Sequence, residues 1–330
     1  MQHNLTPKEL PELTIESLGE ATIDSPLKGS GRQFVDDSES VHVYSHNILV
    51  EQCQKELGHV PVFELAGPRE KLFFDPATLN CGIVTCGGLC PGLNDVIRTI
   101  TLTLAWQYKV NTIYGFRYGY AGLSSNAPEE PIVLTPETVD KIHNDGGSIL
   151  GSSRGPQEVD DMIDHLVKRD ISILFVIGGD GTLRGAGALA EGVKARGLNI
   201  SVIGIPKTID NDISGIERSF GFSTAVEEAR TAVMGAHEEA KGAWNGVGMV
   251  KLMGRDSGFI AAAATLANSD VNFCFIPEVP LTLEGENGFL RNLEQRLLAL
   301  YGKEARLKVG GDRGMYTARV TLPVDGGEDG

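Results

Sequence analysis

Two short runs of the sequence place carboxylates where phosphate chemistry could use them. Gly178-Gly179-Asp180-Gly181-Thr182 sets one carboxylate between glycines at the end of an apolar run. A magnesium ion bound to phosphates needs such an oxygen ligand with space around it, so Asp180 is the predicted metal ligand. The structural alternative is that Asp180 or Thr182 only caps the helix that follows.

The second run, Thr208-Ile209-Asp210-Asn211-Asp212, gathers two carboxylates, an amide and a hydroxyl directly after another apolar run. Turn formation explains one or two of these residues, because Asp and Asn favour turns, but hardly all of them. A general base for a sugar hydroxyl explains Asp210 better, because a phosphoryl transfer needs a carboxylate at the hydroxyl and charge neutralisation at the phosphates. Asp210 and Thr208 are therefore predicted catalytic residues.

Glycines and arginines elsewhere could bind the phosphates themselves. Gly87, Gly88 and Gly92 would let the backbone approach an anion ahead of a helix N-terminus, although glycines at a tight turn are as often only geometric. The loop lacks the Lys-Ser/Thr ending of a P-loop. Arg154 and Arg255 are candidate cations, with ordinary surface arginines as the alternative.

These loops need elements to hold them, and the surrounding pattern supplies strands and helices in alternation. Apolar runs at residues 81–85, 171–177 and 201–205 are predicted strands, and residues 93–106 and 183–194 have helical patterns. This order predicts an α/β fold, with a parallel sheet and helices on both of its faces. In such sheets ligands bind beyond the carboxyl ends of the strands, where all three loops fall. A further apolar run, 247–252, leads through Met253-Gly254-Arg255 into an alanine-rich stretch, 259–267.

Composition and charge limit the classes of binding partner and indicate the type of protein. The chain has 330 residues and a formal charge of −15, which disfavours nucleic acid and anionic membrane surfaces. It begins without a basic segment followed by an apolar run, and no stretch has the length of a membrane span. The five cysteines match no zinc spacing. We therefore expect a soluble cytoplasmic protein with reduced thiols.

At these residues the sequence resembles the phosphofructokinase family. The run from Thr85 to Asn94, the run from Gly178 to Thr182, the run from Pro206 to Asp212 and Met253-Gly254-Arg255 occur in the order and approximate spacing of that family. The likeness covers about residues 63 to 300 and is closest to the long ATP-dependent branch. It implies a 6-phosphofructokinase of glycolysis, which uses ATP and Mg²⁺ to convert fructose 6-phosphate into fructose 1,6-bisphosphate. It also implies a homo-oligomer, either a dimer or a tetramer.

The resemblance also implies roles for single residues. It assigns nucleotide binding to Gly88, Arg154, Gly179, Asp180, Gly181 and Thr182, with Asp180 at the magnesium position. It assigns substrate binding to Thr208, Asp210, Met253, Gly254 and Arg255, with Asp210 as the catalytic base and Arg255 at the transferred phosphoryl group.

Two residues concern the phosphoryl donor. Pyrophosphate-dependent family members resemble one another in having Asp where this chain has Gly181, and that side chain fills the space of the ATP α-phosphate. Lys207 matches a lysine typical of the pyrophosphate enzymes, although the long ATP branch also carries it. The glycine favours ATP, and a pyrophosphate-dependent enzyme is the alternative.

The C-terminal part departs from the family pattern. We expect an N-terminal extension (1–62), a nucleotide-binding domain with the catalytic loop (63–245), the start of a sugar-phosphate domain (246–302) and an atypical tail (303–330), so that the second domain is incomplete. The tail has one strand-like run, 316–322, and is expected to be poorly ordered. A helix is expected at 289–300. Alternatives are a catalytically silent nucleotide-binding subunit, and a diacylglycerol- or NAD-kinase-like protein, which the loops at Thr208 and Arg255 disfavour.

Overall fold

The computed structural model describes residues 13, 15–244, 246–279, 295, 298 and 303, and the backbone of residues 306–312 and 315–321. The chain forms two compact units, Met1–Met253 and Gly254–Gly330. The domain boundaries predicted at residues 62, 245 and 302 stay predictions.

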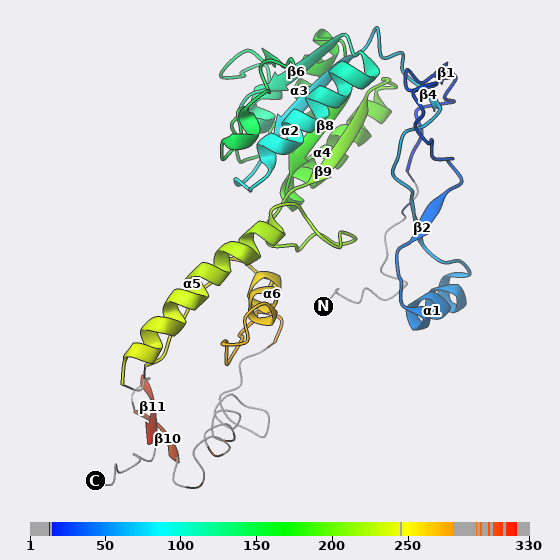
Figure 1. Cartoon of the computed structure of the whole chain (residues 1–330). Coiled ribbons are helices and arrows are strands. Elements are labelled where there is room, and N and C mark those ends of the chain that lie inside the picture. The colour runs from blue at the N-terminus through cyan, green and yellow to red at the C-terminus, as the bar shows by residue number, and fades with distance from the viewer. Residues whose placement is uncertain are drawn as a thin grey trace. The chain divides into compact units, whose positions relative to one another are not determined.

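A five-stranded sheet forms the centre of the first unit (Figure 1). In spatial order its strands are β7 (Ile132–Val133), β6 (Thr112–Phe116), β5 (Asn80–Thr85), β8 (Ile171–Gly178) and β9 (Ser201–Pro206). All neighbours are parallel except the edge strand β7, which runs antiparallel to β6. The three predicted strands are confirmed, each one residue longer than expected, and the predicted parallel sheet gains one antiparallel edge.

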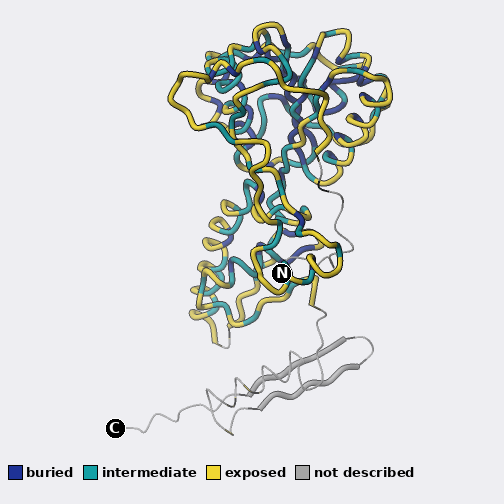
Figure 2. Tube along the Cα trace, turned by 90° about the vertical axis from the view of Figure 1, so that its right-hand side faces the viewer, coloured by how far each residue is buried: buried dark blue, intermediate teal, exposed yellow. Residues whose placement is uncertain are grey.

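Helices cover both faces of this sheet, as predicted. They are α2 (Leu93–Leu102), which continues as a π-helix (Thr103–Tyr108), α3 (Val159–Lys168) and α4 (Asp180–Ala195). Leu93 and Ile97 of α2 pack with Ile83 on one face. The buried side chains of α3 and α4 pack with Val84 on the other. Consecutive strand residues point to opposite faces, so a strand buried on both sides becomes a continuous apolar run. Figure 2 shows the buried residues concentrated in this layered part.

The N-terminal extension contains regular structure that the sequence did not predict. Strand β1 (Ile23–Asp24) pairs with β4 (Lys71–Leu72), and β2 (Ser40–His42) pairs with β3 (Val62–Glu64), both antiparallel. Helix α1 (Asn47–Leu57) lies between β2 and β3 and ends at Gly58, whose φ is 77°. Its one buried residue is Cys53, so its apolar pattern is too weak to predict a helix.

The end of the first unit differs from the sequence pattern. Helix α5 (Phe222–Gly242) is followed by residues 246–252, which form no strand, and the side chains of Val247 and Met249 are 86% and 87% exposed. An apolar run becomes a strand only when a neighbouring backbone accepts and donates its hydrogen bonds. Among the described strands β9 pairs only with β8, so residues 246–252 do not extend the sheet.

In the second unit, part of the alanine-rich stretch forms helix α6 (Phe259–Leu266), which buries Ile260 and Ala264. The tail contains two strands rather than one, β10 (Arg306–Asp312) and β11 (Met315–Thr321), which pair antiparallel. Gly310 and Gly311, which look like a turn in the sequence, lie inside β10 opposite Thr317 and Tyr316. The paired backbone therefore corrects the expected single strand, and the expected poor order of the tail stays a prediction. The expected helix at 289–300 lies outside the described residues except at 295 and 298.

Candidate functional site at the carboxyl edge of the sheet

The connections of the sheet reverse direction between β5 and β8. The chain leaves β5 through α2 and reaches β6 on one side, and it leaves β8 through α4 and reaches β9 on the other. Such a reversal opens a crevice at the carboxyl ends of the two strands. The register aligns Thr85 with Ile177 and Gly178 with Pro206. The predicted loops after β5, β8 and β9 therefore start from the same edge.

The glycine loop after β5 depends on backbone conformations that favour glycine. Gly87 has a φ of 81°, and Gly92, the N-cap of α2, has a φ of 93°. Gly88 has an ordinary φ but is close to Arg154, whose Nη2 would lie 3.7 Å from a Cβ at Gly88. The structure thus brings the predicted nucleotide residues Gly88 and Arg154 together.

Two cysteines at this loop, Cys86 before Gly87 and Cys90 between Gly88 and Gly92, offer no nucleophile. Burial raises the pKa of the Cys86 thiol to about 12 and that of Cys90 to about 11. Both therefore stay protonated near neutral pH, and a thiolate mechanism is disfavoured here.

The loop after β8 turns directly into α4, which begins at Asp180 rather than at the predicted residue 183. The N-cap is Gly179, and no side chain caps it, so neither Asp180 nor Thr182 has the alternative role of N-cap. Thr182 is buried against the preceding turn, where a Cβ at Gly178 would lie 2.4 Å from its side chain. These glycines leave the first turn of α4 open toward the crevice.

Asp180 is exposed and forms an ion pair with Arg184, with 2.7 Å between Oδ2 and Nη1. An exposed pair of this kind contributes about 0–1 kcal/mol, so a metal–phosphate ligand can displace it. No group of three or more His, Cys, Asp or Glu residues that could hold a metal occurs in the described part of the chain. The donor set suits a magnesium ion that takes most of its ligands from phosphate and water and one from Asp180.

Lys207 links the loops after β5, β8 and β9. Its side chain is buried, its Nζ donates a hydrogen bond to the carbonyl oxygen of Gly88, and its backbone N–H donates to the carbonyl oxygen of Gly178. Burial lowers the pKa of its ammonium group. The Lys207 cation therefore lies between the glycine loop and the start of α4, where phosphate groups would need a positive charge.

The loop after β9 is closed by its own side chains. The Asp210 N–H donates to Thr208 Oγ1 over 3.0 Å, and Ser219 Oγ donates to the Thr208 carbonyl oxygen over 2.5 Å. Asn211, with a φ of 56°, accepts from the Ser219 N–H over 2.7 Å. These bonds fix the position of the half-buried Asp210 in the loop that follows β9 and Lys207.

Met253, Gly254 and Arg255 lie at the boundary between the two units. Met253 ends the first unit and is 72% exposed. Gly254 has a φ of 148°, and a Cβ there would lie 2.2 Å from the Ser257 carbonyl oxygen. Arg255 has a φ of 53° and pairs with its neighbour Asp256 over 3.4 Å. The parts that these three residues play in the site stay predictions.

Tyr120 was missed by the sequence analysis. It lies on a 3₁₀ helix, Gly119–Leu123, that follows β6 at the same sheet edge. Its buried hydroxyl donates to the Thr182 carbonyl oxygen over 2.7 Å, and a Cβ at Gly185 would lie 2.8 Å from its ring. Tyr120 therefore supports the first turns of α4. The signal available in the sequence was the pair Gly119 and Gly122, which flank Tyr120 after the apolar run 112–116 and indicate a tight turn.

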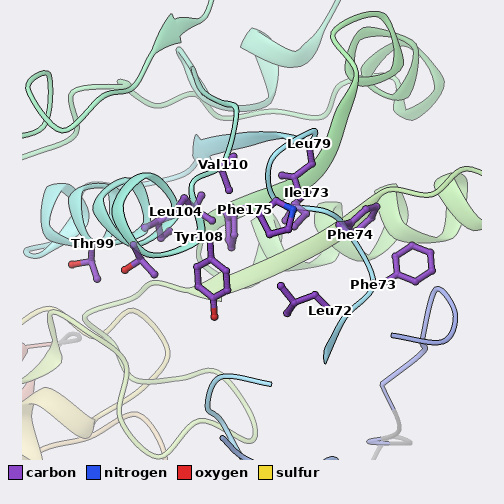
Figure 3. A pocket seen from close by; sticks show the side chains of 13 residues that line it. Leu72, Phe73, Phe74, Leu79, Thr99, Leu104, Tyr108, Val110, Ile173 and Phe175 are labelled. Atoms are coloured by element: carbon purple, nitrogen blue, oxygen red, sulfur yellow. The ribbon is translucent and has the colours of Figure 1, made fainter. Parts of the chain in front are cut away.

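An apolar pocket of about 420 Å³ occurs elsewhere in the first unit (Figure 3). Leu79 and Val110, which line it, precede β5 and β6, so the pocket lies toward the amino ends of the strands. None of its lining residues is charged. It is separate from the loops of the carboxyl edge and unsuited to phosphate.

The sequence is similar to known phosphofructokinases. A family profile described as Phosphofructokinase matches residues 80–309. The protein named ATP-dependent 6-phosphofructokinase of Borreliella burgdorferi is 48% identical over 87% of this chain and 65% of its own length. The protein of that name from Entamoeba histolytica is 48% identical over 85% of this chain and 64% of its own length. The chain thus spans slightly less than two thirds of these curated relatives.

Solved structures show the same fold. A pyrophosphate-dependent phosphofructokinase from Marinobacter aquaeolei aligns with a TM-score of 0.53 and 24% identity over 68% of this chain and 58% of its own. The phosphofructokinase of Pichia pastoris in the T-state aligns with a TM-score of 0.55 and 21% identity over 74% of this chain and 28% of its own. At these identities the likeness concerns the fold, and it confirms the predicted phosphofructokinase-like architecture.

Proposed function

Since the chain belongs to the phosphofructokinase family, we propose that it phosphorylates fructose 6-phosphate with ATP to give fructose 1,6-bisphosphate and ADP. The observation that carries this proposal concerns the loops after β5, β8 and β9. They meet where the connections of the sheet reverse direction, and the Lys207 cation lies between them. The names of the relatives from Borreliella burgdorferi and Entamoeba histolytica support the same activity.

The proposed nucleotide side uses the loops after β5 and β8. Gly88 and Gly179 would allow the phosphates to approach the backbone, and the start of α4 at Asp180 and Gly181 would offer N–H groups to them. The Thr182 N–H donates to the Gly179 carbonyl oxygen over 2.9 Å, so Thr182 would act through its side chain or through the turn that it closes. Arg154 beside Gly88 supplies a guanidinium group for phosphate oxygens. A magnesium ion held by Asp180 and by phosphate oxygens would neutralise charge on the transferred group.

The proposed chemistry centres on Asp210. Its carboxylate accepts the proton of the sugar hydroxyl while the hydroxyl oxygen bonds to the γ-phosphorus and the bond to ADP breaks. Thr208 holds the backbone of Asp210 through its Oγ1. Arg255, with Met253 and Gly254, would bind the sugar phosphate and the transferred group.

Space at Gly181 supports ATP over pyrophosphate as the donor. A Cβ at Gly181 would have no atom within 4 Å among the described residues, so a larger group can occupy that position. The α-phosphate of ATP needs such room. Lys207 is the residue that favours pyrophosphate, but the long ATP-dependent branch also carries this lysine, and here its Nζ donates to the Gly88 carbonyl oxygen.

A second candidate is a catalytically silent chain that binds nucleotide and regulates a longer partner. Cytoplasmic location and a homodimer or homotetramer stay expectations. Five free thiols and the formal charge of −15 support a soluble protein that does not bind nucleic acid. No helix in the described residues is long and apolar enough to cross a membrane.

The test is a coupled assay of the purified chain with fructose 6-phosphate, Mg²⁺ and either ATP or pyrophosphate, together with calorimetric titration of ATP–Mg²⁺. Turnover with ATP supports the proposal. Turnover with pyrophosphate alone overturns the choice of donor. ATP binding without turnover identifies the silent nucleotide-binding chain, and absence of both overturns the proposed function.

A further inference from the structure

The buried amide of Asn94 joins the start of α2 to a distant loop. Asn94 is 3% exposed, and it lies two residues after the N-cap of α2. Its Nδ2 donates to the Asp145 carbonyl oxygen over 2.9 Å, and its Oδ1 accepts from the Ile149 N–H over 2.9 Å. The donor and the acceptor of the Asn94 amide are thus both hydrogen-bonded to one segment, 145–149. Packing of α2 against the sheet would not by itself require these two bonds.

The same segment is fastened again farther along the chain. Thr85 Oγ1 donates to the Gly151 carbonyl oxygen over 2.6 Å. Ser152 Oγ donates to the Gly87 carbonyl oxygen over 2.5 Å, and the Gly87 N–H donates to the Ser153 carbonyl oxygen over 3.1 Å. Residues 145–153 are therefore attached to α2 at their beginning and to the glycine loop at their end.

Arg154 directly follows this attached segment. It is exposed, and in the described part of the chain it takes part in no ion pair, yet its Nη2 would lie 3.7 Å from a Cβ at Gly88. No carboxylate partner among the described residues holds the Arg154 guanidinium group, so keeping this long side chain in one direction costs rotamer entropy. The backbone before Arg154 is thus the main restraint on where its guanidinium group lies.

We propose that Asn94 is a positioning residue for nucleotide phosphates: its amide holds segment 145–149 so that Arg154 stays beside the glycine loop. This inference rests on the proposed function, because it assumes that Arg154 binds the nucleotide. Asn94 itself does not contact the ligand. Its removal should weaken ATP binding through Arg154 and leave other interactions of the site in place.

Asn94→Asp tests this with little change of shape. The carboxylate can still accept from Ile149, but it cannot donate to the Asp145 carbonyl oxygen and repels it. We expect ATP–Mg²⁺ to bind about tenfold more weakly, as for a buried hydrogen bond replaced by an unsatisfied polar pair. Backbone amides of residues 145–153 should exchange faster. Asp95→Asn, the exposed neighbour on the same helix, is the matched control and should change neither.

A double-mutant cycle separates positioning from a general structural effect. If Asn94 acts through Arg154, Asn94→Asp should weaken ATP binding less than about twofold in an Arg154→Ala background. Additive losses would overturn the inference, as would parent-like affinity in Asn94→Asp. If that variant does not fold, Thr85→Val removes the attachment at Gly151 and must show the same non-additivity. A parent chain that binds no ATP overturns the proposed function and this inference together.

Discussion

The two sides of the proposed site are held in different ways. On the nucleotide side, buried groups join three segments: the glycine loop after β5, the start of α4 and the loop after β9. Lys207 is bonded to the carbonyl oxygens of Gly88 and Gly178. On the sugar-phosphate side, Arg255 is 79% exposed and pairs with its own neighbour, Asp256. The first arrangement fixes the loops through the fold. The second leaves the Arg255 side chain to be ordered by a ligand, at a cost in rotamer entropy.

This difference predicts that substitutions on the two sides separate nucleotide binding from sugar-phosphate binding. A variant in the loops after β5 and β8 should act on ATP, a variant at Asp210 should act on turnover, and a variant at Arg255 should act on fructose 6-phosphate. Changes that affect both ligands equally would argue against two separately held sides.

Asp210→Asn should have the largest effect. Removal of a general base lowers kcat by about 10²- to 10⁴-fold, and the amide keeps the shape of the loop. ATP–Mg²⁺ affinity in calorimetry should stay near that of the parent. Asp212→Asn is the matched control in the same loop, where Asp212 is exposed. Steady-state rates that are equal in parent and Asp210→Asn would remove Asp210 from the mechanism.

Arg255→Ala should raise the KM for fructose 6-phosphate by on the order of 10- to 100-fold, the usual range for losing a charge-assisted hydrogen bond. ATP affinity should be unchanged. Asp256→Ala removes the exposed ion-pair partner and should change either constant little, because such surface pairs contribute about 0–1 kcal/mol. An equal loss of ATP affinity in Arg255→Ala would mean that the two sides are not separate.

Gly181→Asp should weaken ATP binding by about tenfold, because the carboxylate would crowd and repel the α-phosphate, whereas pyrophosphate lacks that group. The fold should tolerate the change, since a Cβ at Gly181 would meet no described atom within 4 Å. Gly187→Asp, in equally open space on the same helix, is the control for lost helix stability. Unchanged ATP kinetics in Gly181→Asp would leave the choice of donor without support.

The sequence predicts the nucleotide side well because its signals are local. The apolar runs 81–85, 171–177 and 201–205 define three strands almost to the residue, and parallel strands bring their ends together. The start of α4 at Asp180 was missed because the glycines beside it suggested a loop. The apolar run 247–252 forms no strand, because an apolar run does not show whether a neighbouring strand exists.

Interactions between distant segments were beyond sequence reasoning. The Asn94 amide spans 51 and 55 residues to its two partners, and the Tyr120 hydroxyl spans 62 residues to Thr182. A single sequence contains no period or spacing that relates such positions. Only the glycine-rich surroundings of Tyr120 indicated a tight turn, and they did not indicate its partner.

Tyr120→Phe should have the smallest effect, and it tests whether the nucleotide side depends on buried support. The substitution removes one hydroxyl that donates over 2.7 Å to the Thr182 carbonyl oxygen and keeps the ring against Gly185. We expect a loss of about 1 kcal/mol in the free energy of unfolding, measured by denaturant titration. Since Thr182 lies in the first turn of α4, the ATP KM should rise by less than about fivefold. Tyr114→Phe is the matched control, because the Tyr114 hydroxyl has no hydrogen bond within the described residues of the same sheet. If both variants kept parent stability and ATP affinity, the Tyr120 hydroxyl would not support α4, and the buried bonds that distinguish the nucleotide side would have to act elsewhere.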